Sequence, residues 1–322
     1  MSVLEKIKEK IEQATNILIL THENPDGDAV GSSLGLLQAL KKMGKTATVL
    51  IPKINNMYSF LPGFSEIKSE IENVEEFDLC VALDSSDIER LYICKPYFEQ
   101  IESTVVIDHH ITNQNFGDVN YVNAIASSTC QNLIVVLAAM DVTISKEMAE
   151  CIYTGILTDT GGFRYNTQPE TFEFAAMLLE TGIDIAKIYR IVFDTITEKR
   201  TRLLSRALDR LELFEEGKIA FTYITEEDTT ELKSEDGDHE NIVNYGRNIE
   251  GVEVSIFVRQ KDEKYKVSLR ANEYVDVSQI ASKYAGGGHL RAAGLEMAMP
   301  LEQVKQTLVE EIKKQLKWKM DY

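Results

Sequence analysis

The chain has 322 residues, 44% of them hydrophobic, and a formal net charge of −18 at pH 7. This length suits one large domain or two of ordinary size, and the hydrophobic fraction is typical of a globular protein. An acidic surface repels long nucleic acid, so a nucleic-acid substrate has to be short or held in a local basic pocket. The sequence shows no apolar signal segment and no apolar run of membrane length, and we expect a cytoplasmic protein without membrane contact.

The first half of the chain alternates apolar runs of strand length with longer stretches that have helical spacing. Strands are predicted at 16–22, 46–52, 77–84 and 103–110, and helices at 28–44, 127–140, 146–163 and 170–182. Alternation of this kind favours an α/β fold with a doubly wound, mainly parallel sheet. In such sheets, binding sites form at the carboxyl ends of the strands.

The second half indicates a smaller mixed α/β domain. Strands are predicted at 218–224, 252–260 and 265–272, and helices at 276–286 and 301–316. The acidic stretch at 224–240 is most simply a solvated surface, with a flexible lid as the alternative. A long charged helix precedes these elements. We therefore expect a catalytic domain at 1–195, a connecting helix at 196–214 and a second domain at 215–322, with the active site in the cleft between the domains.

Side chains that can bind metals follow the predicted strands of the first half. They are His22, Asp26 and Asp28 after the first strand, Asp84 after the third, Asp108, His109 and His110 at the end of the fourth, and Asp159 near the end of a helix. Taken singly, each is more simply a polar loop residue or a helix cap. Because parallel strand ends meet at one edge of a sheet, we expect the set to lie close together, where carboxylates repel unless a cation neutralises them.

The histidines support a metal site. The chain has five, of which three stand in these motifs, while His289 lies in a glycine-rich segment and His239 in an acidic one. Carboxylates and imidazoles without thiolates suit Mn²⁺ or a similar divalent ion better than structural zinc. The set is too large for one ion, and two ions about 3.5–4 Å apart can clamp both oxygens of a displacement at phosphorus and acidify a water molecule. The predicted reaction is metal-assisted phosphoester hydrolysis.

The segment "YAGGGHLRAAG" is a candidate anion site in the second half. The residues that could bind phosphate there or nearby are Gly286, Gly287, Gly288, His289, Arg291, Arg270 and, more weakly, Arg247. Glycine N–H groups can approach an anion closely, and the helical turn expected after them would favour negative charge. Two alternatives stay open: a tight structural turn with a capping histidine, and a solvated loop charge in the case of Arg247.

Five segments together resemble the DHH phosphoesterase superfamily. "HENPDGDAVGS", "ALDSSD", "DHH" and "GILTDTGGF" resemble its four motifs in order, and "GGGHLRAAG" resembles the signature of its DHHA1 domain. The resemblance covers nearly the whole chain. Length and domain pairing are most similar to the NrnA group of oligoribonucleases (nanoRNases), which also remove the 3′-phosphate of pAp (adenosine 3′,5′-bisphosphate).

This resemblance implies a role for each motif residue. One Mn²⁺ would be held by His22, Asp26 and Asp84, and a second by Asp28, Asp84, His109 and Asp159, with Asp84 bridging. The catalytic residues would be Asp84, His110, which would face the scissile phosphate, and Asp108, which would orient the histidines. The glycines, His289 and Arg270 of the second domain would bind the terminal phosphate or nucleotide across the cleft.

The function implied is Mn²⁺-dependent hydrolysis of short single-stranded RNA or DNA, about two to five nucleotides long, to mononucleotides, and of pAp to AMP. Homodimerisation is a further expectation. One alternative is a phosphodiesterase acting mainly on cyclic-dinucleotide products such as pApA, or on cyclic di-AMP. Another is a catalytically idle nucleotide-binding module, which the filled ligand positions argue against.

Overall fold

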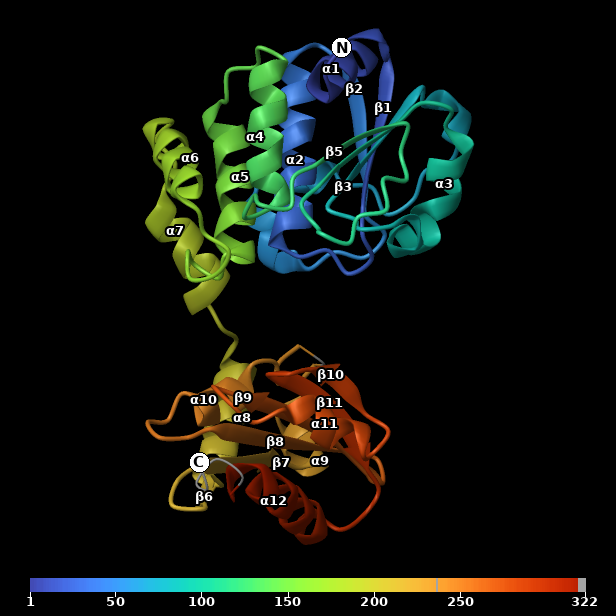
Figure 1. Ribbon diagram of the computed structural model, residues 1–322. Helices are drawn as coiled ribbons and strands as arrows, with labels where there is room; N and C mark the ends of the chain where they lie inside the picture. The colour runs from blue at the N-terminus through green and yellow to red at the C-terminus, as the bar shows by residue number, and fades with distance from the viewer. Residues whose placement is uncertain (236, 318–322) are drawn as a thin grey trace. The chain divides into compact units, whose positions relative to one another are not determined.

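The computed structural model describes residues 1–235 and 237–317 of the chain. The chain divides into two compact units between Thr195 and Ile196. Each unit has its own sheet (Figure 1). Each also has its own hydrophobic core. Among the described residues, no helix is both long enough and apolar enough to cross a membrane.

The first unit is built on five parallel strands in the order β2-β1-β3-β4-β5. They are β1 (Asn16–Thr21), β2 (Thr46–Leu50), β3 (Leu79–Leu83), β4 (Thr104–Asp108) and β5 (Val119–Val122). The predicted parallel sheet is confirmed. The edge strand β5 is an addition, because its four residues are mostly half-buried and form no continuous apolar run.

Helices cover both faces of this sheet. One face carries α1 (Val3–Gln13), α2 (Gly27–Lys42), α4 (Thr129–Ala139) and α5 (Lys146–Asp159), and the other carries η4 (Ile88–Cys94) and α3 (Lys95–Gln100). Side chains alternate accordingly along β1: Ile17 and Ile19 join the core with α2, whereas Leu18 and Leu20 join the core with α3.

The remaining helices of the first unit are short or lie outside these two layers. Between β2 and β3 come η1 (Asn56–Phe60), η2 (Phe64–Glu66) and η3 (Val74–Glu76). After α5 come α6 (Pro169–Glu180), α7 (Ile185–Tyr189) and one π-helical turn, η5 (Arg190–Asp194). Both α6 and α7 pack on α5.

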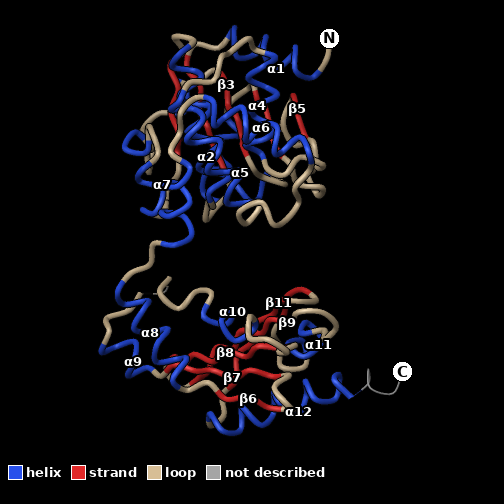
Figure 2. The backbone as a smooth tube through the Cα atoms, turned by 90° about the vertical axis from the view of Figure 1, so that its left-hand side faces the viewer, coloured by secondary structure: helices blue, strands red, loops and turns tan. Residues whose placement is uncertain are grey.

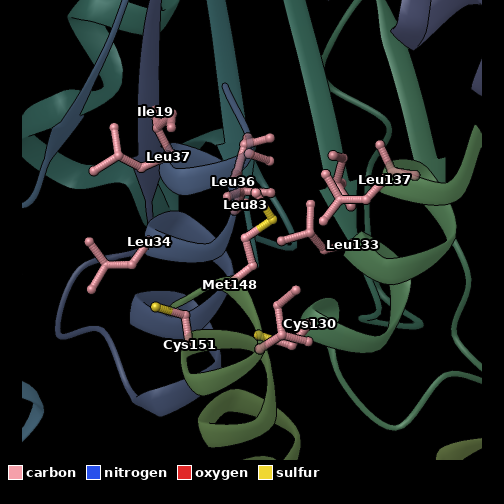
Figure 3. Packing of buried hydrophobic residues seen from close by; sticks show 14 of the residues in the cluster. Ile19, Leu34, Leu36, Leu37, Leu83, Cys130, Leu133, Leu137, Met148 and Cys151 are labelled. Atoms are coloured by element: carbon pink, nitrogen blue, oxygen red, sulfur yellow. The ribbon is translucent and has the colours of Figure 1, made fainter. Parts of the chain in front are cut away.

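Two glycines let α2 approach α5 and α4 closely. A Cβ at Gly31 would lie 2.5 Å from the Cys151 carbonyl oxygen, and one at Gly155 would lie 2.9 Å from Asp28 Oδ1. Such separations are too short for real Cβ atoms, so larger residues would push the helices apart. Buried aliphatic and sulfur side chains fill the space around this contact (Figure 3). The close approach sets Asp28, in the first turn of α2, against α5.

The second unit has a six-stranded sheet in the order β10-β11-β9-β8-β7-β6 (Figure 2). The strands are β6 (Glu212–Phe214), β7 (Ile219–Ile224), β8 (Val254–Lys261), β9 (Lys264–Ala271), β10 (Gly287–His289) and β11 (Ala292–Met297). The pair β7–β8 is parallel and the other neighbouring pairs are antiparallel, which gives the expected mixed sheet.

Helices flank this second sheet as well. One core contains α11 (Val277–Ser282) and α12 (Leu301–Lys317), and a smaller one contains α8 (Glu198–Asp209) and α10 (Ile242–Arg247), with α9 (Glu226–Glu231) packed beside α8. The predicted helix at 196–214 is too long. Helix α8 ends at Asp209, and residues 212–214 form β6 instead, because they pair antiparallel with β7.

Candidate metal-binding active site

Three strands of the first sheet end at the same edge in polar side chains. His22 follows β1, Asp84 follows β3, and Asp108 ends β4. The connection from β1 to β2 runs through α2 on one face, whereas the connection from β3 to β4 runs through η4 and α3 on the other. The strand order therefore reverses between β1 and β3, and open parallel sheets form their binding sites at such a reversal.

The predicted metal ligands lie together at this edge. Three groups have ligand atoms within 4.8 Å of one another: His22 with Asp26 and Asp84, Asp28 with His109 and Asp159, and Asp84 with His109 and His110. Shared members merge these groups into one cluster. His109 Nε2 faces three carboxylates, with Asp159 Oδ2 at 3.4 Å, Asp84 Oδ1 at 3.7 Å and Asp28 Oδ2 at 4.0 Å.

Asp84 lies at the centre of the cluster, and its position is fixed from several sides. It is 2% exposed and has a φ of 56°, a left-handed conformation in which aspartate is one of the better-tolerated residues. Its N–H donates to the Ile107 carbonyl at 3.1 Å, and its Oδ1 accepts from the Thr129 hydroxyl at 2.9 Å. Burial alone would raise the pKa of Asp84, but His22, His109 and His110 outweigh that effect and lower it.

His22 approaches Asp84 from the end of β1. Its Nδ1 lies 2.7 Å from the Glu23 carbonyl oxygen, which can only accept, so Nδ1 carries the proton. Its Nε2 lies 3.6 Å from Asp84 Oδ2, on the side of the cluster. A histidine held through one nitrogen with the other free is the usual arrangement of a metal ligand.

The two aspartates of "PDGD" are held by helix starts. Asp26 caps α2, since its Oδ1 accepts from the N–H groups of Asp28 at 3.0 Å and Ala29 at 3.1 Å. Asp28 is fully buried and accepts from the first turn of α4, from Thr129 N–H at 2.6 Å and Cys130 N–H at 2.9 Å. Capping therefore explains how these side chains are oriented but leaves carboxylate oxygens for another partner.

The cluster carries more negative charge than the protein neutralises. Burial, followed by the charges of Asp84 and Asp159, raises the pKa of Asp28 well above its ordinary value. The pKa of Asp159 is raised to about 6, first by burial and then by Asp84 and Asp26, with His109 opposing. Within the described part of the chain, no lysine or arginine forms an ion pair with these carboxylates. The donor set therefore fits a divalent cation.

Asp108 and His110 form a second layer of the site. Asp108 is fully buried and belongs to none of the three metal-competent groups. Its Oδ1 lies 2.7 Å from His110 Nδ1, and its Oδ2 accepts from Asn113 Nδ2 at 2.6 Å. The hydrogen bond that His110 Nδ1 donates to Asp108 raises the pKa of His110 and directs Nε2 of the ring away from the carboxylate. This geometry suits the predicted roles, which are orientation by Asp108 and phosphate contact by His110.

Three polar residues that the sequence analysis missed complete the site. Thr129 holds both Asp84 and Asp28, Asn113 holds Asp108, and Asn132 Nδ2 donates to the Asp108 carbonyl at 2.9 Å. The one signal available was "SST" at the start of a predicted helix, where serine and threonine are common caps. The capping pattern predicts the start of the helix. It does not reveal that the Thr129 hydroxyl donates to Asp84, which follows β3.

In the second unit, two of the predicted phosphate-binding residues are close neighbours. Arg270, on β9, is half-buried, and its pKa is lowered first by burial and then by the charge of Arg247. Its Nη1 donates to the Leu269 carbonyl at 3.0 Å. Asn272 supports Arg247 by donating to its carbonyl at 3.0 Å. Two neighbouring guanidinium groups are an arrangement that suits anions.

The glycine-rich segment is a hairpin, and the expected helical turn after it is wrong. Residues 287–289 form β10, which pairs antiparallel with β11. Cβ atoms at Gly286 and Gly288 would collide with the backbone of Gly294 and Ala292, so close strand contact requires these two glycines. Gly287 faces open space, and His289 is exposed beside it. If this segment binds an anion, the donors are therefore backbone N–H groups of the hairpin and not those of a helix N-terminus.

Arg291 holds a loop of the same unit. Its guanidinium donates to the Val275 carbonyl at 2.9 Å and also to the Glu273 carbonyl. These bonds give Arg291 a structural task, and its phosphate-binding role stays a prediction.

Comparison with known proteins agrees with this architecture. The chain matches the DHH family N-terminal domain over residues 16–156 and the DHHA1 domain over residues 216–317. It is 35% identical over 304 residues to the bifunctional oligoribonuclease and PAP phosphatase NrnA of Thermus thermophilus, covering 93% of this chain and 90% of that protein. It is 26% identical to the cyclic-di-AMP phosphodiesterase PdeA of Listeria monocytogenes over 98% of this chain and 48% of that protein.

A solved structure is similar over the same extent. The exopolyphosphatase-related protein from Bacteroides fragilis has a TM-score of 0.85 and 31% identity, and the match covers 97% of this chain and 96% of that one. Fold, paired domains and the carboxylate–imidazole cluster agree with one another. The chain therefore belongs to the DHH family and is a metal-dependent phosphoesterase.

Proposed function

We propose that this protein is a Mn²⁺-dependent phosphohydrolase that degrades oligonucleotides of about two to five nucleotides to mononucleotides and dephosphorylates pAp to AMP. The observation that carries the proposal is the merged cluster around Asp84, in which every expected ligand is present. The 35% identical relative is named for the same two activities. The filled ligand positions argue against an idle binding module.

Two divalent ions fit the cluster by its donor chemistry. His22, Asp26 and Asp84 would hold one, and Asp28, Asp84, His109 and Asp159 the other, so that Asp84 is shared. Bound there, the ions would neutralise charge that builds up on the phosphate and make a water nucleophile available near neutral pH. A mixture of carboxylate and imidazole ligands without thiolates suits Mn²⁺ or a similar divalent ion better than structural zinc.

The chain's own residues position the substrate. His110, held by Asp108 through Nδ1, would present Nε2 to a phosphate oxygen and stabilise the charge that develops there. In the second unit, Arg270, Arg247, Arg291, His289 and the backbone of Gly286–Gly288 are proposed to bind the terminal phosphate or the nucleotide. The four cysteines are buried free thiols, which agrees with the proposed cytoplasmic location.

A turnover panel tests this proposal. The purified chain is supplied with Mn²⁺ and given RNA of two to five nucleotides, pAp, pApA and pyrophosphate. We expect hydrolysis of the short RNAs and of pAp, and loss of that hydrolysis when EDTA removes the metal. Turnover of pyrophosphate alone, or of nothing, would overturn the proposal.

A second candidate is a phosphodiesterase that acts mainly on pApA or cyclic di-AMP. The similarity to PdeA over nearly the whole of this chain supports this second candidate. Competition separates the two candidates. If pApA blocks RNA hydrolysis at far lower concentration than pAp does, and is itself turned over faster, the second candidate is correct.

His289→Ala tests the assignment of the second unit to substrate binding. Because His289 is proposed to bind and not to activate the nucleophile, we expect its loss to raise KM about tenfold or more with kcat nearly unchanged. Steady-state kinetics with pAp measure both constants. A collapsed kcat at unchanged KM would show that the role of His289 is misassigned.

A further inference from the structure

A cavity of about 300 Å³ opens in the first unit beside the metal-binding cluster. It lies between the loop after β1, the loop after β2 and the helix η4, and His22 is part of its lining. Because His22 also belongs to the cluster around Asp84, the cavity and the cluster share a wall. This volume is at the small end of ligand pockets and suits part of one nucleotide rather than a whole oligonucleotide.

The cavity lining is largely apolar. Ile51, Leu91 and Cys94 are buried and form its inner part, whereas Tyr92 and Ile93 are 58% and 56% exposed. Two neighbouring large apolar side chains that are more than half exposed have unfavourable contact with water unless a ligand covers them. Because Tyr92 and Ile93 line a cavity next to the catalytic cluster, we infer that the apolar part of the substrate covers them.

One buried polar group in the lining is unsatisfied. The Thr21 hydroxyl has no hydrogen-bond partner within the described residues, although the side chain is only 5% exposed. A buried hydroxyl without a partner is costly, and a rotation of the Thr21 side chain would let it donate to or accept from a bound molecule. An occupant with an apolar face and a polar edge would satisfy both features of the cavity.

The position of Tyr92 is imposed by the surrounding chain. Its φ of 50° and ψ of −119° are strained for a residue other than glycine. Next to it, the Glu23 N–H donates to the Arg90 carbonyl at 2.8 Å and ties the loop after β1 to η4. This hydrogen bond links the segment that carries Tyr92 to the loop that carries His22.

We propose that this cavity is a nucleobase subsite, in which the base of the nucleotide whose phosphate lies at the metal cluster stacks on Tyr92. The proposal rests on the phosphohydrolase function above and extends it to the substrate's base. Stacking on an aromatic ring tolerates any base, which agrees with an enzyme that degrades short RNA of varied sequence. The Thr21 hydroxyl then contacts the polar edge of the base.

The test compares a substrate that has a base with one that lacks it. The substrates are pAp and the abasic ribose 3′,5′-bisphosphate, each with Mn²⁺. The variants are Tyr92→Ala, the ring-preserving Tyr92→Phe, and Tyr165→Ala, which removes a tyrosine of similar exposure (60%) outside the cavity. Ile93→Ala tests the neighbouring apolar side chain independently.

We expect Tyr92→Ala to raise KM for pAp at least about fivefold, the effect of losing one base–aromatic stack. The same variant should leave kcat and the KM for the abasic substrate unchanged. Tyr92→Phe and Tyr165→Ala should behave as the wild type, and Ile93→Ala should show a smaller rise for pAp only. Equal changes for both substrates, or no change for either, would overturn the proposal.

A binding measurement gives a readout that does not need turnover. The 2-aminopurine analogue of pAp should lose fluorescence when its base stacks in the wild type and in Tyr92→Phe, and much less in Tyr92→Ala. If the wild type hydrolyses neither substrate, the proposed function fails, and the fluorescence titration still decides whether the cavity binds a base. Equal quenching in wild type and Tyr92→Ala would rule out the subsite.

Discussion

At the scale of single residues, Asp84 concentrates the constraints of the site. It belongs to two of the three metal-competent groups, its backbone is left-handed, and the Thr129 hydroxyl fixes one of its carboxylate oxygens. A strained backbone at a strand end is retained only where its surroundings enforce it, and such positions gather at functional sites. Asp84 therefore lies among several charged side chains, and its backbone and hydrogen bonds prevent it from moving away from them.

Asp84→Asn should abolish hydrolysis while the fold persists. Asparagine tolerates the left-handed backbone and still accepts from Thr129, but it lacks the charge that two cations would share. We expect turnover of pAp to fall at least about a thousandfold. Circular dichroism should stay unchanged, and Mn²⁺ should raise the melting temperature of the wild type but not of the variant. Near-normal turnover in Asp84→Asn with Mn²⁺ would contradict the assignment of the shared ligand.

At the scale of elements, α8 and α9 are joined by a buried ion cluster in the second unit. Asp228, on α9, is 2% exposed, and its Oδ1 lies 2.8 Å from Arg206 Nη1. Arg210 also forms an ion pair with Asp228. Arg206 belongs to the last turn of α8, and Arg210 caps the C-terminal end of that helix. Burial alone would raise the pKa of Asp228. The hydrogen bonds from Arg210, Thr225 and Arg206 outweigh burial and hold that pKa well below its ordinary value.

The sign of the resulting pH dependence follows from this depressed pKa. An aspartate with a lowered folded-state pKa stabilises the fold fully above its ordinary value near 4, and the contribution is lost as the pH falls below that. Asp228→Asn should therefore lower the free energy of unfolding by about 2 kcal/mol at pH 7, an estimate for a buried pair whose arginines stay partly hydrated. Urea unfolding at pH 7 and at pH 3 measures the difference, which should shrink at pH 3.

Glu227→Gln is the matched control for this prediction. It removes an exposed carboxylate from the same helix and should change stability little at either pH. A loss in Asp228→Asn that is equally large at pH 3 and pH 7 would mean that packing, not charge, holds α9 in place.

The same element shows where sequence reasoning ends. Composition predicts a solvated surface for the acidic stretch at 224–240, because it does not reveal that arginines of the preceding helix pair with Asp228. Strands β1 to β4 of the first sheet are predictable because each belongs to an apolar run, and the cluster follows because parallel strands end together. By contrast, β6 and β10 are three residues each, too short for a periodic signal. The sequence suggests anion binding for Gly286 and Gly288, and it does not reveal that close strand contact also requires these two glycines.

At the scale of the whole molecule, the first unit carries partly exposed apolar side chains on α6 and α7. Phe172 and Leu179 lie on the same outer side of α6 and are 55% and 41% exposed, while Ala175 and Leu178 are buried against the core. Tyr189, on α7, is 38% exposed. An apolar helix face of this kind is typical of an association surface, and the homodimer expected from the sequence stays a prediction.

The net charge of −18 sets how such association should respond to salt. Two copies repel one another at low ionic strength, and salt screens that repulsion without weakening apolar contacts. Light scattering after size-exclusion chromatography should therefore report a dimer whose dissociation constant falls as salt is raised. Phe172→Glu and Leu179→Glu should give monomers, whereas Leu213→Glu, at a 49% exposed site on β6, should not. A chain that stays monomeric at every salt concentration, or dimers that survive both α6 variants, would show that this face has another purpose.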